Sequence, residues 1–130
     1  MTTHVAAHRP GRIVSISAWV LQIALAVAIA PGGVLKLIGD PAMVDLFNDI
    51  GAGQWMRYLV GACEVAGGVG LLVPRVRALA ALGLLLLLIG ATITNVFVLD
   101  ASPVLSTVFA VVALVIVLLR RHELPTRSEI

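Results

Sequence analysis

Residues 78–99 read ALAALGLLLLLIGATITNVFVL, a mostly apolar run with no charged side chain. A stretch of about 20 apolar residues is long enough to cross the hydrocarbon core of a bilayer as an α-helix. The rest of the chain has the same character, because 60% of the 130 residues are hydrophobic and only 12% are charged. Soluble domains carry roughly 25% charged residues. The composition therefore predicts an integral membrane protein.

Three more apolar segments accompany this run. We expect membrane-spanning helices at about residues 13–39, 55–73, 78–99 and 104–119. The first segment contains a signal-peptide-like cleavage pattern at Ala28-Ile29-Ala30, but its apolar part exceeds the roughly 7–15 residues usual for a signal peptide. We therefore expect this segment to remain as an uncleaved first span.

The four segments predict an all-α fold, a four-helix transmembrane bundle formed by a single membrane domain over residues 1–130. Pro31-Gly32-Gly33 lies inside the first span. Proline removes a backbone hydrogen-bond donor and glycine adds conformational freedom, so we expect a kink or a local break there. Gln22, midway along the same span, is typical of a side chain that hydrogen-bonds to a neighbouring helix.

A short amphipathic helix is predicted at about residues 41–50, between the first and second spans. Asp40 is a candidate N-cap and Pro41 suits the first helical position. Apolar residues follow at i, i+3, i+4 and i+7, namely Met43, Leu46, Phe47 and Ile50. This spacing favours a helix lying at the membrane interface and ending at Gly51. The alternative is a loop whose apolar residues cover the mouth of the bundle.

The distribution of charges predicts the orientation of the chain. Basic residues near the ends of spans tend to stay in the cytoplasm. With four spans, seven of the nine basic residues fall on one side: Arg9, Arg12, Arg75, Arg77, Arg120, Arg121 and Arg127. Four aspartates fall on the other side: Asp40, Asp45, Asp49 and Asp100. Both termini are therefore expected in the cytoplasm, and Lys36 and Arg57 are the exceptions to the pattern.

Four polar residues in the predicted spans are candidates for a ligand-binding site: Lys36, Glu64, Thr92 and Asn95. Glu64 lies near the middle of its span, where a charge costs about 2.5–3.5 kcal/mol, so it should face the bundle interior. At a rise of about 1.5 Å per residue, all four fall in the outer half of the bundle and could line one pocket. The alternative is a buried polar network that fixes the register of the helices.

Several classes of site are disfavoured by the residues present. The single cysteine, Cys63, cannot form an intrachain disulfide and lies in an apolar run typical of a buried thiol. The three histidines, His4, His8 and His122, lie in the polar tails without the spacing of metal ligands, so we expect no metal site. No basic run is interleaved with aromatic residues, which argues against binding to nucleic acid. No cofactor motif is evident.

Three stretches of the chain resemble the DoxX-like family of small bacterial membrane proteins. They are GVLKLIG at 33–39 with PAMV at 41–44, WMRYLVGACEVAGGVGLLVP at 55–74, and the segment from RALAALG at 77–83 to GATITN at 90–95. The resemblance covers roughly residues 20–100. The family commonly has histidine at the position of Asn95, so a role that needs a titrating imidazole there does not carry over.

The resemblance implies a four-helix protein of the bacterial inner membrane. By analogy with the thiosulfate:quinone oxidoreductase subunits of the wider family, it also implies a link to redox chemistry, as an oxidoreductase-associated subunit or a binding module for a quinone or lipid. The residues show no autonomous catalytic motif. The lipid bilayer is one expected partner, and another protein or a second copy of the chain is a further candidate. The alternatives are a small proton-coupled multidrug-type transporter and a structural assembly factor.

Overall fold

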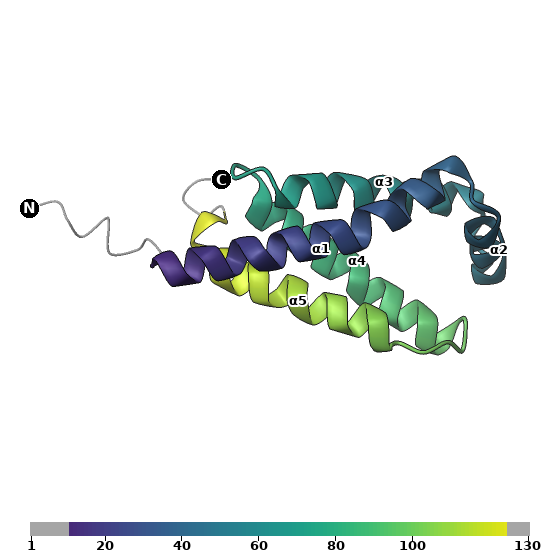
Figure 1. Ribbon diagram of the computed structural model, residues 1–130. Coiled ribbons are helices and arrows are strands. Elements are labelled where there is room, and N and C mark those ends of the chain that lie inside the picture. The colour runs from purple at the N-terminus through teal and green to yellow at the C-terminus, as the bar shows by residue number, and fades with distance from the viewer. Residues whose placement is uncertain (1–10, 125–130) are drawn as a thin grey trace, which may run out of the picture.

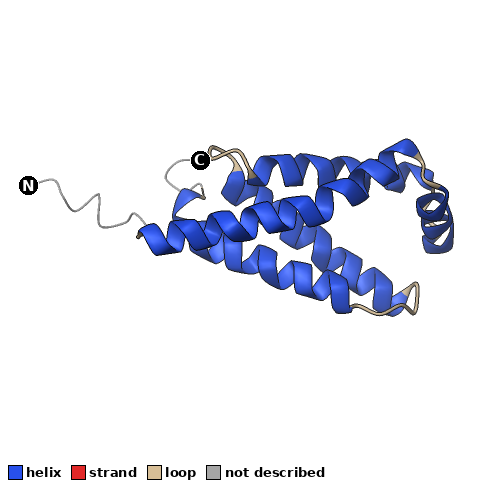
Figure 2. Ribbon diagram, in the orientation of Figure 1, coloured by secondary structure: helices blue, strands red, loops and turns tan. Residues whose placement is uncertain are grey.

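The computed structural model describes residues 11–124 of the chain. Its helices are α1 (Arg12–Ile38), α2 (Pro41–Ile50), α3 (Gln54–Leu71), α4 (Arg77–Phe97) and α5 (Val104–Arg120), followed by the short 3-10 helix η2 (Arg121–Glu123). No strand occurs among these residues (Figure 2). This part of the chain is all-helical, as predicted, and each long helix begins and ends within two residues of an expected span.

Three helices are long and apolar enough to cross a membrane: α1, α4 and the continuous segment Val104–Glu123 of α5 with η2. They correspond to the first, third and fourth predicted spans. The second predicted span coincides with α3, which is not among them in the described part of the chain. This helix carries Arg57 and Glu64 and is rich in glycine, which lowers its hydropathy.

α1 continues without interruption through Pro31, so the expected local break does not occur. Figure 1 shows instead that the axis of α1 changes direction before its C-terminal end. The helix ends at Gly39, whose φ of 76° lies in the left-handed region that glycine adopts at low cost. α1 is therefore bent rather than divided.

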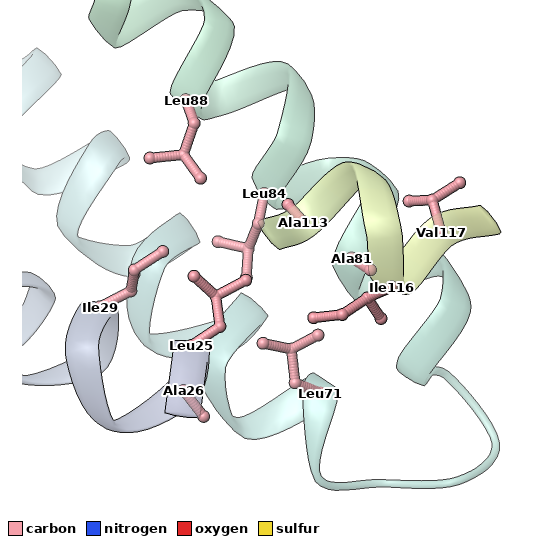
Figure 3. Close-up of a cluster of buried hydrophobic side chains, with 10 residues drawn as sticks. All are labelled: Leu25, Ala26, Ile29, Leu71, Ala81, Leu84, Leu88, Ala113, Ile116 and Val117. Carbon is pink, nitrogen blue, oxygen red and sulfur yellow. The ribbon is translucent and has the colours of Figure 1, made fainter. Parts of the chain in front are cut away.

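The four long helices lie side by side, with α1 and α4 each packed against both α3 and α5 (Figure 1). A buried apolar cluster joins all four, and its side chains meet in Figure 3. Its members are Leu25, Ala26, Ile29, Leu71, Ala81, Leu84, Leu88, Ala113, Ile116 and Val117. Many large apolar side chains on the outside of the same helices are exposed, as expected for surfaces that face lipid.

α2 occupies the residues predicted for the amphipathic helix. Figure 1 shows it turned across the direction of the long helices, at the opposite end of the molecule from the N-terminal end of α1. Pro41 is its first residue and Gly51, with a φ of 83°, ends it. The Asp40 side chain makes no capping hydrogen bond; its backbone carbonyl accepts from Met43 and Val44 instead. Phe47 is buried while Asp45 and Asp49 are exposed, so the helix is amphipathic in the folded chain.

Candidate ligand-binding site

α1 and α3 approach closely because glycines face each other where the two helices meet. A Cβ atom built on Gly33 would lie 2.8 Å from the Gly61 carbonyl oxygen, and one built on Gly61 would lie 2.9 Å from the Gly33 carbonyl oxygen. No ordinary side chain fits at such distances. One turn farther along each helix stand Lys36 and Glu64, so the glycine contact sets the distance between these two side chains.

Lys36 and Glu64 form a direct ion pair. The Lys36 Nζ atom lies 2.7 Å from Glu64 Oε1, and the two side chains are only 13% and 14% exposed. Glu64 Oε1 is buried and makes no hydrogen bond within the described residues, so the ammonium is its close polar neighbour. The sequence predicted that the two residues could line one pocket, and the structure places them in direct contact.

Arg57 is the second basic residue that departs from the charge pattern, and its contacts explain its position. Its side chain is 5% exposed and its guanidinium donates to the carbonyl oxygen of Lys36 and to Gln54 Oε1. The Lys36 carbonyl belongs to the last turn of α1, where carbonyl groups lack helical partners and a cation is favoured. Arg57 thus holds the backbone of Lys36 while Glu64 holds its side chain.

Gln54 connects the same network to α2. Its amide nitrogen donates to the Val44 carbonyl oxygen at 3.0 Å and to Asn48 Oδ1 at 2.9 Å, while its amide oxygen accepts from Arg57. In the sequence, Arg57 stands out only as an exception to the charge pattern, and Gln54 does not stand out. The signal available was the end of α1 at Gly39, which leaves carbonyl groups that need a donor.

A cavity of about 400 Å³ lies between α2, α3 and α4, with Lys36 and Glu64 in its wall. Its lining is otherwise mostly apolar. α2 contributes Leu46, Phe47 and Ile50; α3 contributes Met56 and Val60; α4 contributes Leu86, Leu87, Leu88, Gly90, Ala91, Thr94 and Asn95; and the segment after α4 contributes Val98 and Leu99. This size and this mixture of apolar walls with a few polar groups are typical of small-molecule sites.

Three of the four predicted site residues, Lys36, Glu64 and Asn95, line this cavity. The structure does not bring Thr92 into it. The Thr92 hydroxyl faces α5 instead, where it lies 2.8 Å from the Ser106 hydroxyl, and it donates to the Leu88 carbonyl oxygen. Thr94, two residues farther along α4, lines the cavity in its place.

A second polar cluster ties the opposite end of the molecule together. Arg120 is 1% exposed; its Nε atom donates to Gln22 Oε1 at 2.9 Å, and Gln22 donates in turn to the Leu71 carbonyl oxygen at 2.6 Å. Glu123 accepts two hydrogen bonds from Arg77. Gln22 acts between helices as predicted, whereas the buried role of Arg120 was not anticipated.

The sequence model of the DoxX-like family matches residues 20–119. The chain belongs to the DoxX-like family. The match includes α3 and α4 in full and most of α1 and α5, and therefore all the residues that line the cavity. No curated protein and no solved structure gives a significant match. Family membership and three apolar helices identify this DoxX-like protein as an integral membrane protein.

Proposed function

We propose that this DoxX-like protein is a membrane-embedded binding protein for an amphiphile with a small polar head and an apolar body. A quinone is the leading ligand and a lipid-like molecule the alternative source of the same chemistry. The observation that supports this most directly is the Lys36–Glu64 pair in the wall of a mostly apolar cavity of about 400 Å³. A charged pair costs desolvation in such a place, and a ligand that uses its free donors offsets part of that cost.

The donors in the cavity suit a head group that carries hydrogen-bond acceptors. The Lys36 ammonium has three donor positions and Glu64 takes one side of it. Asn95 adds an amide whose present contact, to Ser106 Oγ, is long at 3.5 Å. A quinone ring has carbonyl acceptors and apolar faces, so these residues fit it. Lys36 and Asn95 would donate hydrogen bonds to the carbonyl oxygens, and the leucines of the cavity would pack against the faces of the ring. The quinone would supply reversible redox chemistry when bound.

We also propose that α3 crosses the membrane, which completes a four-helix transmembrane bundle with α2 at the outer interface. α3 contains two charged residues, and both have partners on α1, which lowers the cost of placing them in lipid. The arginine pattern supports a topology with α2 outside and the connection at Arg75 on the cytoplasmic side of a bacterial inner membrane. In a variant without Cys63, cysteines introduced at Asp45 and Arg75 should react with a membrane-impermeant thiol reagent from opposite sides; reaction from the same side would contradict this topology.

Duroquinone, a benzoquinone without a long tail, tests the proposed site. We expect it to bind the purified protein in dodecyl maltoside micelles, measured by equilibrium dialysis against protein-free micelles. Gly90 lines the cavity, and a Cβ built on it meets no atom within 4 Å, so Gly90→Leu fills the space without a backbone clash. This variant should weaken binding at least about tenfold. Lys36→Met, which removes one donor, should weaken it about fivefold.

Gly83→Leu is the matched control. Gly83 lies on the same helix, and a Cβ built there also meets no atom within 4 Å, but it does not line this cavity. Its affinity for duroquinone should stay within about twofold of the unmodified protein. Equal binding by all three variants, or none by the unmodified protein, would overturn the quinone site. Mass spectrometry of compounds that co-purify from native membranes then identifies a lipid if a lipid is the ligand.

A further inference from the structure

A second cavity adjoins the first along the outside of α3 and α4. It measures about 650 Å³ and its walls include Cys63, Gly67 and Gly70 on α3 and Leu79, Gly83 and Leu87 on α4. We call it the α3–α4 groove. Leu79 and Leu86 at its edges are 48% and 62% exposed, so the groove opens on the surface that would face lipid.

The groove is adjacent to the first cavity, which we call the polar cavity because Lys36, Glu64 and Asn95 lie in its wall. Leu86 and Leu87 line both of them. On α3, Glu64 lines the polar cavity, and its neighbours Cys63 and Gly67 line the groove. A molecule held at Glu64 therefore lies next to the apolar groove, between the same two helices.

Glycines make the groove possible. A Cβ atom on Gly67 would lie 2.6 Å from Leu84, and one on Gly70 would lie 2.8 Å from the Cβ atom of Ala80, so α3 and α4 meet closely at its floor. At Gly83 the same construction meets nothing within 4 Å, which marks open space. The positions from Leu87 to Leu79 extend about 12 Å along α4 at a rise of about 1.5 Å per residue.

We propose that the ligand of the polar cavity carries a long, single apolar tail and that this tail lies in the α3–α4 groove. This proposal rests on the proposed function, because the head must be held near Lys36 and Glu64. The two cavities lie side by side and share Leu86 and Leu87 in their walls, which supports one molecule occupying both. A tail of about ten carbons matches the length of the groove along α4.

The tail contributes to selectivity in a way that differs from ordinary burial. Lipid chains around the protein are as apolar as leucine, so a tail gains little from leaving them for the groove. It gains by packing against a fixed surface while it is covalently joined to a bound head, which raises its effective concentration there. The site should therefore distinguish tailed from tailless ligands with the same kind of head.

The test compares decylplastoquinone with duroquinone in the same dialysis assay. Gly83→Leu fills the groove, so it should weaken the binding of decylplastoquinone about tenfold, while the affinity for duroquinone should change by less than about twofold. Gly90→Leu should weaken both probes, because both place a ring in the polar cavity. Retained duroquinone binding also shows that Gly83→Leu is folded.

Each other outcome has a defined meaning. If Gly83→Leu leaves both affinities unchanged, or lowers both equally, the groove does not hold the tail. If only decylplastoquinone binds the unmodified protein and Gly83→Leu weakens that binding, a tail binds in the groove without a head site, and both the quinone site and the proposal of one molecule in both cavities are overturned. If native mass spectrometry shows a dimer that Gly83→Leu converts to monomers, a second copy of the chain occupies the groove and the tail proposal is overturned.

Discussion

The Lys36–Glu64 pair predicts a strong energetic coupling between two helices. Lys36→Met keeps most of the side-chain volume but removes the charge that lies 2.7 Å from Glu64. Removing one partner of a fully buried ion pair costs about 3–5 kcal/mol. Both side chains retain slight exposure, at 13% and 14%, so we expect Lys36→Met to lower the free energy of unfolding by about 2–3 kcal/mol.

Glu64→Gln should cost less, about 1 kcal/mol, because the long Lys36 side chain can extend toward the outer end of the molecule and keep its ammonium hydrated. The double variant leaves no unpaired charge. Its free energy of unfolding should therefore be close to that of Glu64→Gln alone, which gives a coupling energy of about 2–3 kcal/mol between the two positions.

The assay is unfolding of the purified protein in dodecyl maltoside micelles by added sodium dodecyl sulfate, followed by circular dichroism. Asp49→Asn and Arg75→Met are suitable controls, since each neutralises an exposed charge and should change stability by no more than about 0.5 kcal/mol. If the effects at Lys36 and Glu64 add to within about 0.5 kcal/mol, the pair carries no coupling and the physical basis for the shared site is refuted.

Three further predictions concern packing and hydrogen bonds. Gly33→Ala should lower the free energy of unfolding by about 1–3 kcal/mol, because its Cβ would lie 2.8 Å from a backbone oxygen. In the same titration, Gly83→Ala should leave the free energy of unfolding unchanged or raise it by up to about 1 kcal/mol, since its Cβ meets no atom within 4 Å. Arg120→Met should lower the free energy of unfolding by about 1–3 kcal/mol, and Arg121→Met, at an exposed position, should lower it by less than about 0.5 kcal/mol. Equal effects of the two substitutions would contradict the buried role of Arg120. Gln54→Ala removes both hydrogen bonds to α2, so hydrogen exchange should speed up there and not in α4.

The sequence was sufficient to predict the helices because their signals are local. Charge-free runs mark α4 and α5, and the pairing of Pro41 with Gly51 marks both ends of α2. The bounds of α2 agree with the prediction because proline fixes the first helical residue and a glycine with positive φ ends the helix.

The candidate site was only partly predictable. Counting residues along a helix gives the depth of a side chain but not the direction in which it points, and successive residues differ by about 100° around the axis. That is why Thr94 lines the cavity and Thr92, at nearly the same depth, faces Ser106. The Gln22–Arg120 contact joins residues 98 positions apart, and no local pattern encodes it.

The placement of the charges gives the molecule an electrical polarity. At the α2 end, Lys36 and Arg57 are bound to internal partners, while three aspartates are exposed: Asp45, Asp49 and Asp100. At the other end, three arginines are exposed: Arg12, Arg75 and Arg121.

In the proposed topology this dipole lies along the membrane normal, with its positive end inside. Moving one elementary charge across a potential of 100 mV changes its energy by about 2.3 kcal/mol. The resting potential of a bacterial cell, negative inside, therefore attracts the arginine end and repels the aspartate end. An inverted copy would have its dipole opposed to the field of the energised membrane.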